Sequence, residues 1–69
     1  MGMENFGEKL KDLRMERGLT LKETALRVGL TRNAIANYEA NIRQPSLETL
    51  KALCKLFEVS ADYLLGLED

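Results

Sequence analysis

The chain has 69 residues, of which 45% are hydrophobic and 30% charged, and its formal net charge is −1. A chain this short buries roughly 60% of the surface that it exposes when unfolded, which suffices for one small core and leaves little room for a deep substrate cleft. One cysteine and no histidine exclude an internal disulfide, a Cys/His zinc site and the usual general base near neutral pH.

These limits predict a single domain over residues 1–69 with no enzymatic activity, no metal and no cofactor. No stretch reaches the ~20 apolar residues of a membrane span, and the first residues lack the basic and apolar regions of a signal peptide. We therefore expect a cytoplasmic protein with no membrane partner, and no small-molecule ligand is evident.

The charge is unevenly distributed along the chain. Residues 1–19 have a net charge of zero and residues 47–69 a net charge of −3, whereas residues 20–46 hold four basic side chains against two acidic ones, a net +2. A net acidic chain is not typical of nucleic-acid binding, but the basic excess falls in the middle of this one.

The first helix is expected at about 6–16. Asn5 and Glu8 have the spacing of an N-terminal capping box, and Phe6, Leu10 and Leu13 recur at helical spacing. Gly18 then ends the helix, because glycine adopts the left-handed conformation after a helix without steric cost.

Two short helices follow. Thr20 and Glu23 form a second capping-box pattern, which opens a helix to about residue 28, and Gly29 ends it. Thr31 caps a third helix that runs to about Glu39.

The one real loop is expected at 40–45, where Asn41 is the residue most tolerant of a left-handed conformation. Ser46 caps a fourth helix and Ser60 a short last one. The apolar stripe of the fourth helix is Leu47, Leu50, Leu53, Cys54 and Phe57. Caps of this quality and the absence of strand-like alternation predict an all-α fold of five helices.

Residues 21–40 have the pattern of a helix-turn-helix unit. Two short helices that cross steeply need a small residue at their contact and a glycine in the turn, and Ala25 and Gly29 occupy those places. Ile35 and Tyr38, three residues apart, anchor the inner face of the second helix of the unit.

The opposite face of that helix carries Arg32, Asn33, Ala36 and Asn37. Arginine can contact guanine and asparagine can contact adenine in a bidentate manner in the major groove, and an alanine between them admits the groove wall. The simpler interpretation is a solvated helix face, but such faces favour Glu and Lys, and this one has neither. The pattern therefore favours DNA recognition.

From Phe6 to Gly66 the chain resembles the Cro/CI-type, or XRE-type, helix-turn-helix domains of phage and bacterial repressors. The resemblance rests on Arg17-Gly18-Leu19-Thr20, Ala25, Val28-Gly29, Thr31-Arg32, Ile35, Tyr38-Glu39, Gln44-Pro45-Ser46 and Val59 to Leu65. It implies a lambda-repressor-like fold whose second helix-turn-helix helix lies in the major groove, a docking geometry known for this family.

The resemblance also implies roles for individual residues. It places base contacts at Thr31, Arg32, Asn33, Ala36 and Asn37, and backbone contacts at Leu21, Lys22 and Arg43. Arg14 and Glu39 match a salt bridge that in the family joins the first and third helices. Relatives commonly dimerise through their C-terminal helices, which here places Leu65 and Leu67 at a homodimer interface.

The chain departs from the family pattern at several positions. Leu21 replaces a phosphate-binding glutamine, Thr24 an apolar residue, and Ile42 a basic residue, while Ala40-Asn41 stands where a glycine is common. Each lost phosphate contact weakens DNA binding. The leading hypothesis is an operator-binding transcriptional regulator acting as a homodimer on double-stranded DNA. The alternative is a protein-interaction module of the same fold that has lost specific DNA binding.

Two residues have simpler interpretations. Cys54 is expected to be a small core residue rather than a nucleophile or redox sensor, and Met15 is expected to serve packing.

Overall fold

The computed structural model describes residues 5–67, so that the two ends of the expected domain, 1–4 and 68–69, lie outside the described residues. Within residues 5–67 the chain is all-helical and has no strand. Its helices are α1 (Phe6–Glu16), α2 (Leu21–Val28), α3 (Arg32–Glu39), α4 (Leu47–Phe57) and α5 (Ala61–Leu64). The expected all-α, five-helix fold is confirmed.

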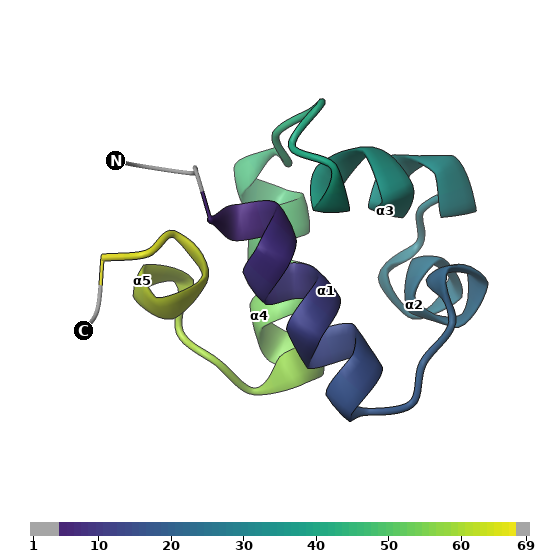
Figure 1. Cartoon of the computed structure of the whole chain (residues 1–69), viewed down its shortest axis with the longest axis horizontal. Coiled ribbons are helices and arrows are strands. Elements are labelled where there is room, and N and C mark those ends of the chain that lie inside the picture. Colours follow the sequence, from purple (N-terminus) through teal and green to yellow (C-terminus); the bar gives the residue numbers. More distant parts are fainter. Residues whose placement is uncertain (1–4, 68–69) are drawn as a thin grey trace.

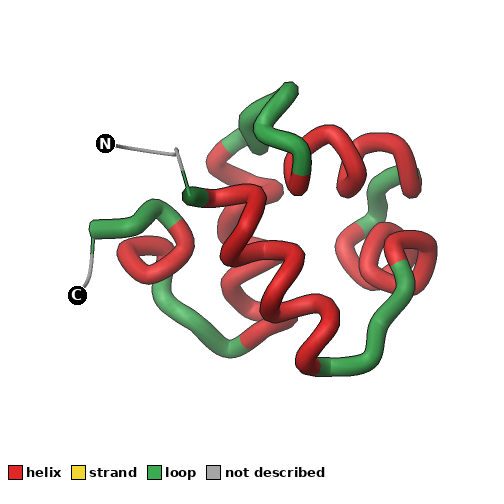
Figure 2. Tube along the Cα trace, in the orientation of Figure 1, coloured by secondary structure: helices red, strands yellow, loops and turns green. Residues whose placement is uncertain are grey.

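In the view of Figure 1, α1 lies in front of α4 near the middle of the molecule. Helix α2 packs against α3 and α4, while α1 contacts α3 and α5. The loops run around the outside of this arrangement, with α2 and α5 on opposite sides of it (Figure 2). No helix of the described part of the chain has the length and apolar character needed to cross a membrane.

Four helices begin at a side-chain cap, as the sequence predicts. The cap accepts a hydrogen bond from the backbone N–H three residues later at Thr20, Thr31, Ser46 and Ser60. Around α2 the capping box is complete, because the Glu23 carboxylate also accepts a hydrogen bond from the Thr20 N–H at 2.8 Å. This hydrogen bond, together with that to the Thr20 side chain, lowers the pKa of Glu23 below the ordinary value of 4.5.

The capping box expected at Asn5 and Glu8 is wrong. Asn5 has φ −100° and ψ 9° and makes no side-chain cap hydrogen bond, whereas the Ncap residue of a capping box has an extended backbone. The first turn of α1 is capped from elsewhere in the chain.

The predicted ends of the helices agree with the structure better than the predicted start of α1. Gly18 and Gly29 have φ of 66° and 74°, and Asn41 has φ 60°, as expected for each. Glu58 also takes a left-handed conformation, with φ 58° at the end of α4. No feature of the sequence had indicated this, because glutamate rarely adopts that conformation.

One hydrophobic core lies between the helices. It contains Phe6, Leu10, Leu13, Ala25, Ile35, Tyr38, Leu50, Leu53, Phe57 and Leu64. The rings of Phe6 and Tyr38 meet edge to face, with centroids 6.5 Å apart, an arrangement that aromatic pairs prefer. This aromatic contact packs α1 against α3.

Two expectations about packing are wrong. Leu47 is 73% exposed and Met15 is 59% exposed. Leu47 has the spacing of the apolar stripe of α4 and is the first residue of that helix. Met15 lies in the last turn of α1 and points away from the core side of that helix.

Two other side chains fit the core. Cys54 is half-buried against the core, and burial raises the pKa of its thiol, which is consistent with packing rather than reactivity. Thr24 is fully buried, and its hydroxyl donates to the Thr20 carbonyl at 3.0 Å. That hydrogen bond offsets the cost of burying a hydroxyl in the core.

Candidate nucleic-acid interface

Helices α2 and α3 form the helix-turn-helix unit. Ala25 is buried where the two helices meet, and its carbonyl accepts hydrogen bonds from the N–H groups of Gly29 and, at 2.8 Å, of Leu30. The left-handed Gly29 lets the chain reverse within this turn. A tight turn fixed at both ends sets the angle at which α3 leaves α2.

Helix α3 has a buried face and an exposed one. Ile35 and Tyr38 are buried and anchor the helix to the core. Of the predicted base-contacting residues on the other side, Arg32 and Asn33 are exposed, and Ala36 and Asn37 are partly exposed. These four residues form a surface, here called the α3 face, that is polar except at Ala36.

Thr31 also stabilises the start of α3. Its side chain is exposed, but its hydroxyl oxygen accepts a hydrogen bond from the Ala34 N–H at 3.2 Å. Thr31 therefore caps α3 at the edge of the α3 face.

An ion pair joins α3 to α1. Arg14 donates from Nε and Nη2 to the two carboxylate oxygens of Glu39, at 2.6 and 3.1 Å, and from Nη1 to the Leu19 carbonyl at 2.9 Å. The side chains are only 13% and 8% exposed. A bidentate pair in this setting has strong directional preference, so Arg14 holds the last turn of α3, α1 and the α1–α2 turn together.

The predicted backbone contacts differ in exposure. Lys22 and Arg43 are exposed, whereas Leu21 is partly buried and packs against the core. The side chain of Leu21 therefore anchors α2 to the core. Its backbone N–H still lies in the first turn of α2, where helices have no intrahelical partner for their N–H groups.

Backbone hydrogen bonds to α3 hold the segment that follows this helix. The N–H groups of Ile42 and Arg43 both donate to the Asn37 carbonyl, at 2.9 and 3.3 Å. Ile42 itself is exposed. The Arg43 side chain thus extends from a backbone that is tied to the third helix.

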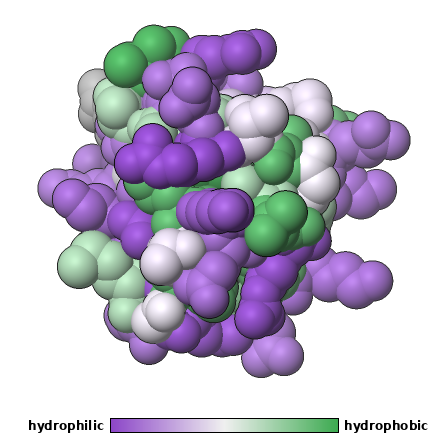
Figure 3. Space-filling view, turned by 90° about the vertical axis from the view of Figure 1, so that its right-hand side faces the viewer, coloured by the Kyte–Doolittle hydropathy of each residue, from purple (hydrophilic) through white to green (hydrophobic). Residues whose placement is uncertain are grey.

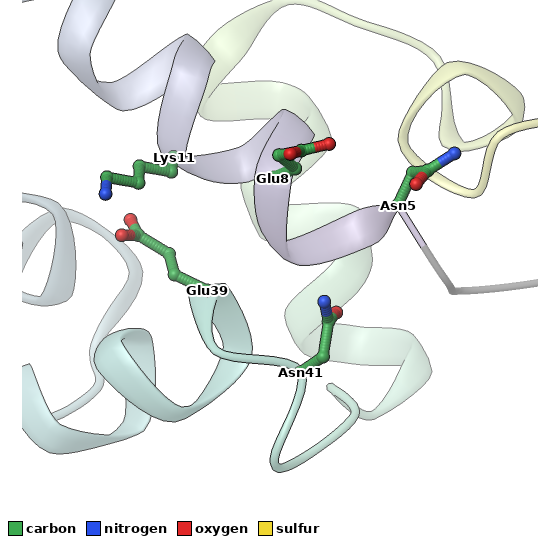
Figure 4. Close-up of a pocket in the computed structure, with 5 residues that line it drawn as sticks. All are labelled: Asn5, Glu8, Lys11, Glu39 and Asn41. Atoms are coloured by element: carbon green, nitrogen blue, oxygen red, sulfur yellow. The ribbon is translucent and has the colours of Figure 1, made fainter.

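Sequence reasoning missed a contact at the other end of α1. The Gly7 N–H donates to the Asn41 side-chain oxygen at 3.0 Å. Around it, Asn5, Glu8, Lys11, Glu39 and Asn41 line an open cleft of about 360 Å³ between α1 and the end of α3 (Figure 4). Gly7 is the residue of the sequence that could have indicated this contact. A glycine inside a helix weakens that helix and often has a packing reason.

The C-terminal segment is attached to α1. The Lys9 ammonium lies 4.8 Å from the centre of the Tyr63 ring, a cation–π contact that fixes α5 on α1. Beyond α5, Leu65 is partly buried against the core, and Leu67 is 64% exposed.

Comparisons with known proteins agree with this geometry. A family model described as Helix-turn-helix matches residues 10–64. The chain belongs to the XRE-type helix-turn-helix family. It is 40% identical over 65 residues to the transcriptional regulator ImmR of Bacillus subtilis, an alignment that covers 94% of this chain and 51% of ImmR.

Solved members of the helix-turn-helix family share the fold. The P22 c2 repressor, crystallised with a synthetic operator, superposes with a TM-score of 0.85 at 32% identity, over 87% of this chain and 91% of that one. SinR in complex with DNA gives a TM-score of 0.78 at 28% identity, over 86% and 95% of the two chains. ImmR is a transcriptional regulator, and the P22 protein is a repressor. It spans about half the length of the curated relatives that it matches.

Proposed function

We propose that the chain is a sequence-specific transcriptional regulator that reads the DNA major groove with α3. The observation that carries the proposal is the α3 face, which presents Arg32, Asn33, Ala36 and Asn37 opposite the buried Ile35 and Tyr38. A helix anchored along one side and polar along the other fits the width of the major groove.

The α3 face has the chemistry to distinguish base pairs. Arg32 can donate two hydrogen bonds to guanine, and Asn33 and Asn37 can each pair with the donor and acceptor of adenine. Ala36 is small enough to bring the helix close to a thymine methyl group. Thr31, at the start of the helix, completes the set of base-contacting residues.

Backbone contacts surround this set. Lys22 precedes the α3 face in the sequence and Arg43 follows it. Both side chains are exposed and supply positive charge that can bind DNA phosphates. The start of α2 offers the N–H groups of Leu21 and Lys22, at the positive end of the helix dipole. A main-chain contact at Leu21 would add a phosphate contact that needs no polar side chain.

We also propose that two copies bind together as a repressor on a palindromic operator. Leu67 is an exposed apolar residue next to the partly buried Leu65, and both lie on the segment that Tyr63 fixes to α1. A homodimer through this end would present two copies of α3 to successive turns of the major groove. SinR and the P22 c2 repressor, both solved with DNA, support DNA binding by this fold.

The alternative is a protein-interaction module without DNA binding. The face of the molecule that holds α2 and the start of α3 argues against it: hydrophilic groups predominate there, and the hydrophobic ones form separate patches (Figure 3). A docking surface for a protein usually has a more continuous apolar centre.

Selection from a random duplex library tests the proposal. The 69-residue chain should enrich a short palindromic site, and its affinity for that site should fall steeply as salt rises, because phosphate contacts release counterions. Enrichment of no sequence at low salt would refute sequence-specific binding and favour the interaction module.

A further inference from the structure

The first turn of α1 is capped by a residue 34 positions away. The Gly7 N–H donates to Oδ1 of Asn41 at 3.0 Å, while Asn5, the local candidate, makes no side-chain cap hydrogen bond. Figure 4 shows Asn41 on the segment after α3, with its carboxamide turned towards α1. Asn41 therefore links α1 to the segment that carries Arg43.

Gly7 also lies against the backbone at the end of α3. A Cβ atom on Gly7 would lie 2.3 Å from the Glu39 carbonyl oxygen and 2.7 Å from that of Tyr38. These are backbone atoms and cannot rotate away. The start of α1 and the end of α3 are thus in direct backbone contact, and the hydrogen bond from Gly7 to Asn41 lies beside that contact.

The segment after α3 is held from two sides. On one side, Ile42 and Arg43 donate backbone hydrogen bonds to Asn37 of α3. On the other, the side chain of Asn41 reaches α1. Asn41 has φ 60°, a conformation that glycine adopts more readily. A glycine here would keep the turn but would have no side-chain acceptor, so the turn alone does not explain the asparagine.

We propose that Asn41 is a positioning residue for DNA binding, whose hydrogen bond to the Gly7 N–H holds the segment after α3 so that Arg43 meets a phosphate. The proposal rests on the proposed function and adds a residue that itself touches no DNA.

A double-mutant cycle between Asn41 and Arg43 tests the proposal. Asn41→Gly should fold, because glycine accepts the left-handed backbone. On a duplex selected from a random library by the wild-type chain, Asn41→Gly should weaken binding about fivefold, the effect of one lost hydrogen bond. The slope of log affinity against log salt concentration should become shallower in Asn41→Gly, by nearly the amount that one phosphate contact contributes. Arg43→Ala should weaken the wild type clearly but change the Asn41→Gly protein little.

Two control variants isolate the hydrogen bond. Asn41→Asp keeps an acceptor and should keep the coupling to Arg43, and the Gly7 amide is expected to exchange more slowly in the wild type and in Asn41→Asp than in Asn41→Gly. Glu58→Gly makes a similar backbone change at another left-handed residue, φ 58° at the end of α4, and should be additive with Arg43→Ala. A role of Asn41 in folding alone would lower the melting temperature without changing the salt dependence or the coupling.

The outcomes are distinct. If the wild type binds its selected duplex and Asn41→Gly binds equally well, or if Arg43→Ala costs the same in both backgrounds, the role of Asn41 is overturned and the proposed function stands. If the wild-type chain selects no duplex, both are overturned.

Discussion

Arg14 and Glu39 form a bidentate ion pair across the interface of α1 and α3, with N···O distances of 2.6 and 3.1 Å. The remaining guanidinium donor contacts the Leu19 carbonyl at 2.9 Å. Both side chains are largely shielded from water, so removal of either partner leaves a charge with poor solvation. This pair fixes the end of the helix that carries the α3 face.

Glu39→Gln should therefore destabilise the fold by about 2 kcal/mol, since it breaks charge-assisted hydrogen bonds in a shielded site. For a domain of this size, the melting temperature should fall by roughly 10 °C, as measured by circular dichroism. Glu58→Gln is a matched control, because Glu58 is 83% exposed and lies 3.8 Å from Arg17. Equal melting temperatures for the two variants would contradict a structural role for Glu39.

Gly7→Ala should destabilise the protein although alanine is the better helix former. The new Cβ would meet backbone atoms of Glu39 at 2.3 Å, and overpacking of this kind costs about 1–3 kcal/mol. Chemical denaturation measures the change. Gly18→Ala provides a comparison, because Gly18 has φ 66° and a Cβ added there would have no atom within 4 Å, so only the backbone conformation is penalised. A Gly7→Ala protein as stable as the wild type would show that the two helices move apart easily.

Arg32→Ala and Arg43→Ala should affect DNA binding in different ways. Loss of a bidentate contact to guanine relaxes the preference at one base pair and costs about 1–3 kcal/mol on the preferred site. Loss of a phosphate contact weakens all sequences similarly and reduces the salt dependence. Binding to a panel of single-base variants of the selected site separates the two effects. Identical profiles for the two variants would refute the assignment of base and backbone roles.

Glu23 should make the stability of α2 dependent on pH in the acid range. The hydrogen bond from the Thr20 N–H holds the pKa of its carboxyl below 4.5, so the folded state favours the ionised form. The stabilisation is complete above the ordinary pKa and is lost as the pH falls through the lowered one. An NMR titration of the Glu23 side chain should give the lowered pKa. Thr20→Ala keeps the backbone N–H but removes the hydroxyl, so it should raise this pKa only part of the way towards 4.5. An unchanged value in Thr20→Ala would contradict the contribution of the Thr20 side chain.

Leu67→Lys should weaken self-association without unfolding the chain, because Leu67 is exposed and a lysine there opposes an apolar interface. Sedimentation of the wild type and the variant, alone and with the selected duplex, measures the effect. Leu26→Lys is a control, since Leu26 is an exposed leucine on α2, on the opposite side of the molecule from the C-terminal segment (Figure 1). If Leu67→Lys associates as the wild type does, the homodimer uses another surface or does not form.

The local structure could be predicted because its causes are local. The caps at Thr20, Thr31, Ser46 and Ser60 join residues three apart, and the inward side of α3 follows from the spacing of Ile35 and Tyr38. Such interactions depend only on helix geometry and side-chain chemistry, both of which can be inferred from the printed sequence. The α3 face was predicted in the same way, as the side opposite the anchors.

The tertiary structure decided what depends on distant partners. Whether Leu47 and Met15 are covered depends on where neighbouring helices end, and both proved exposed. The capping box expected at Asn5 and Glu8 failed because Asn41 reaches the first turn of α1 instead. No periodicity links residues 34 positions apart. Their contact exists only because the fold brings the end of α3 against Gly7, where the missing side chain lets the two backbones touch.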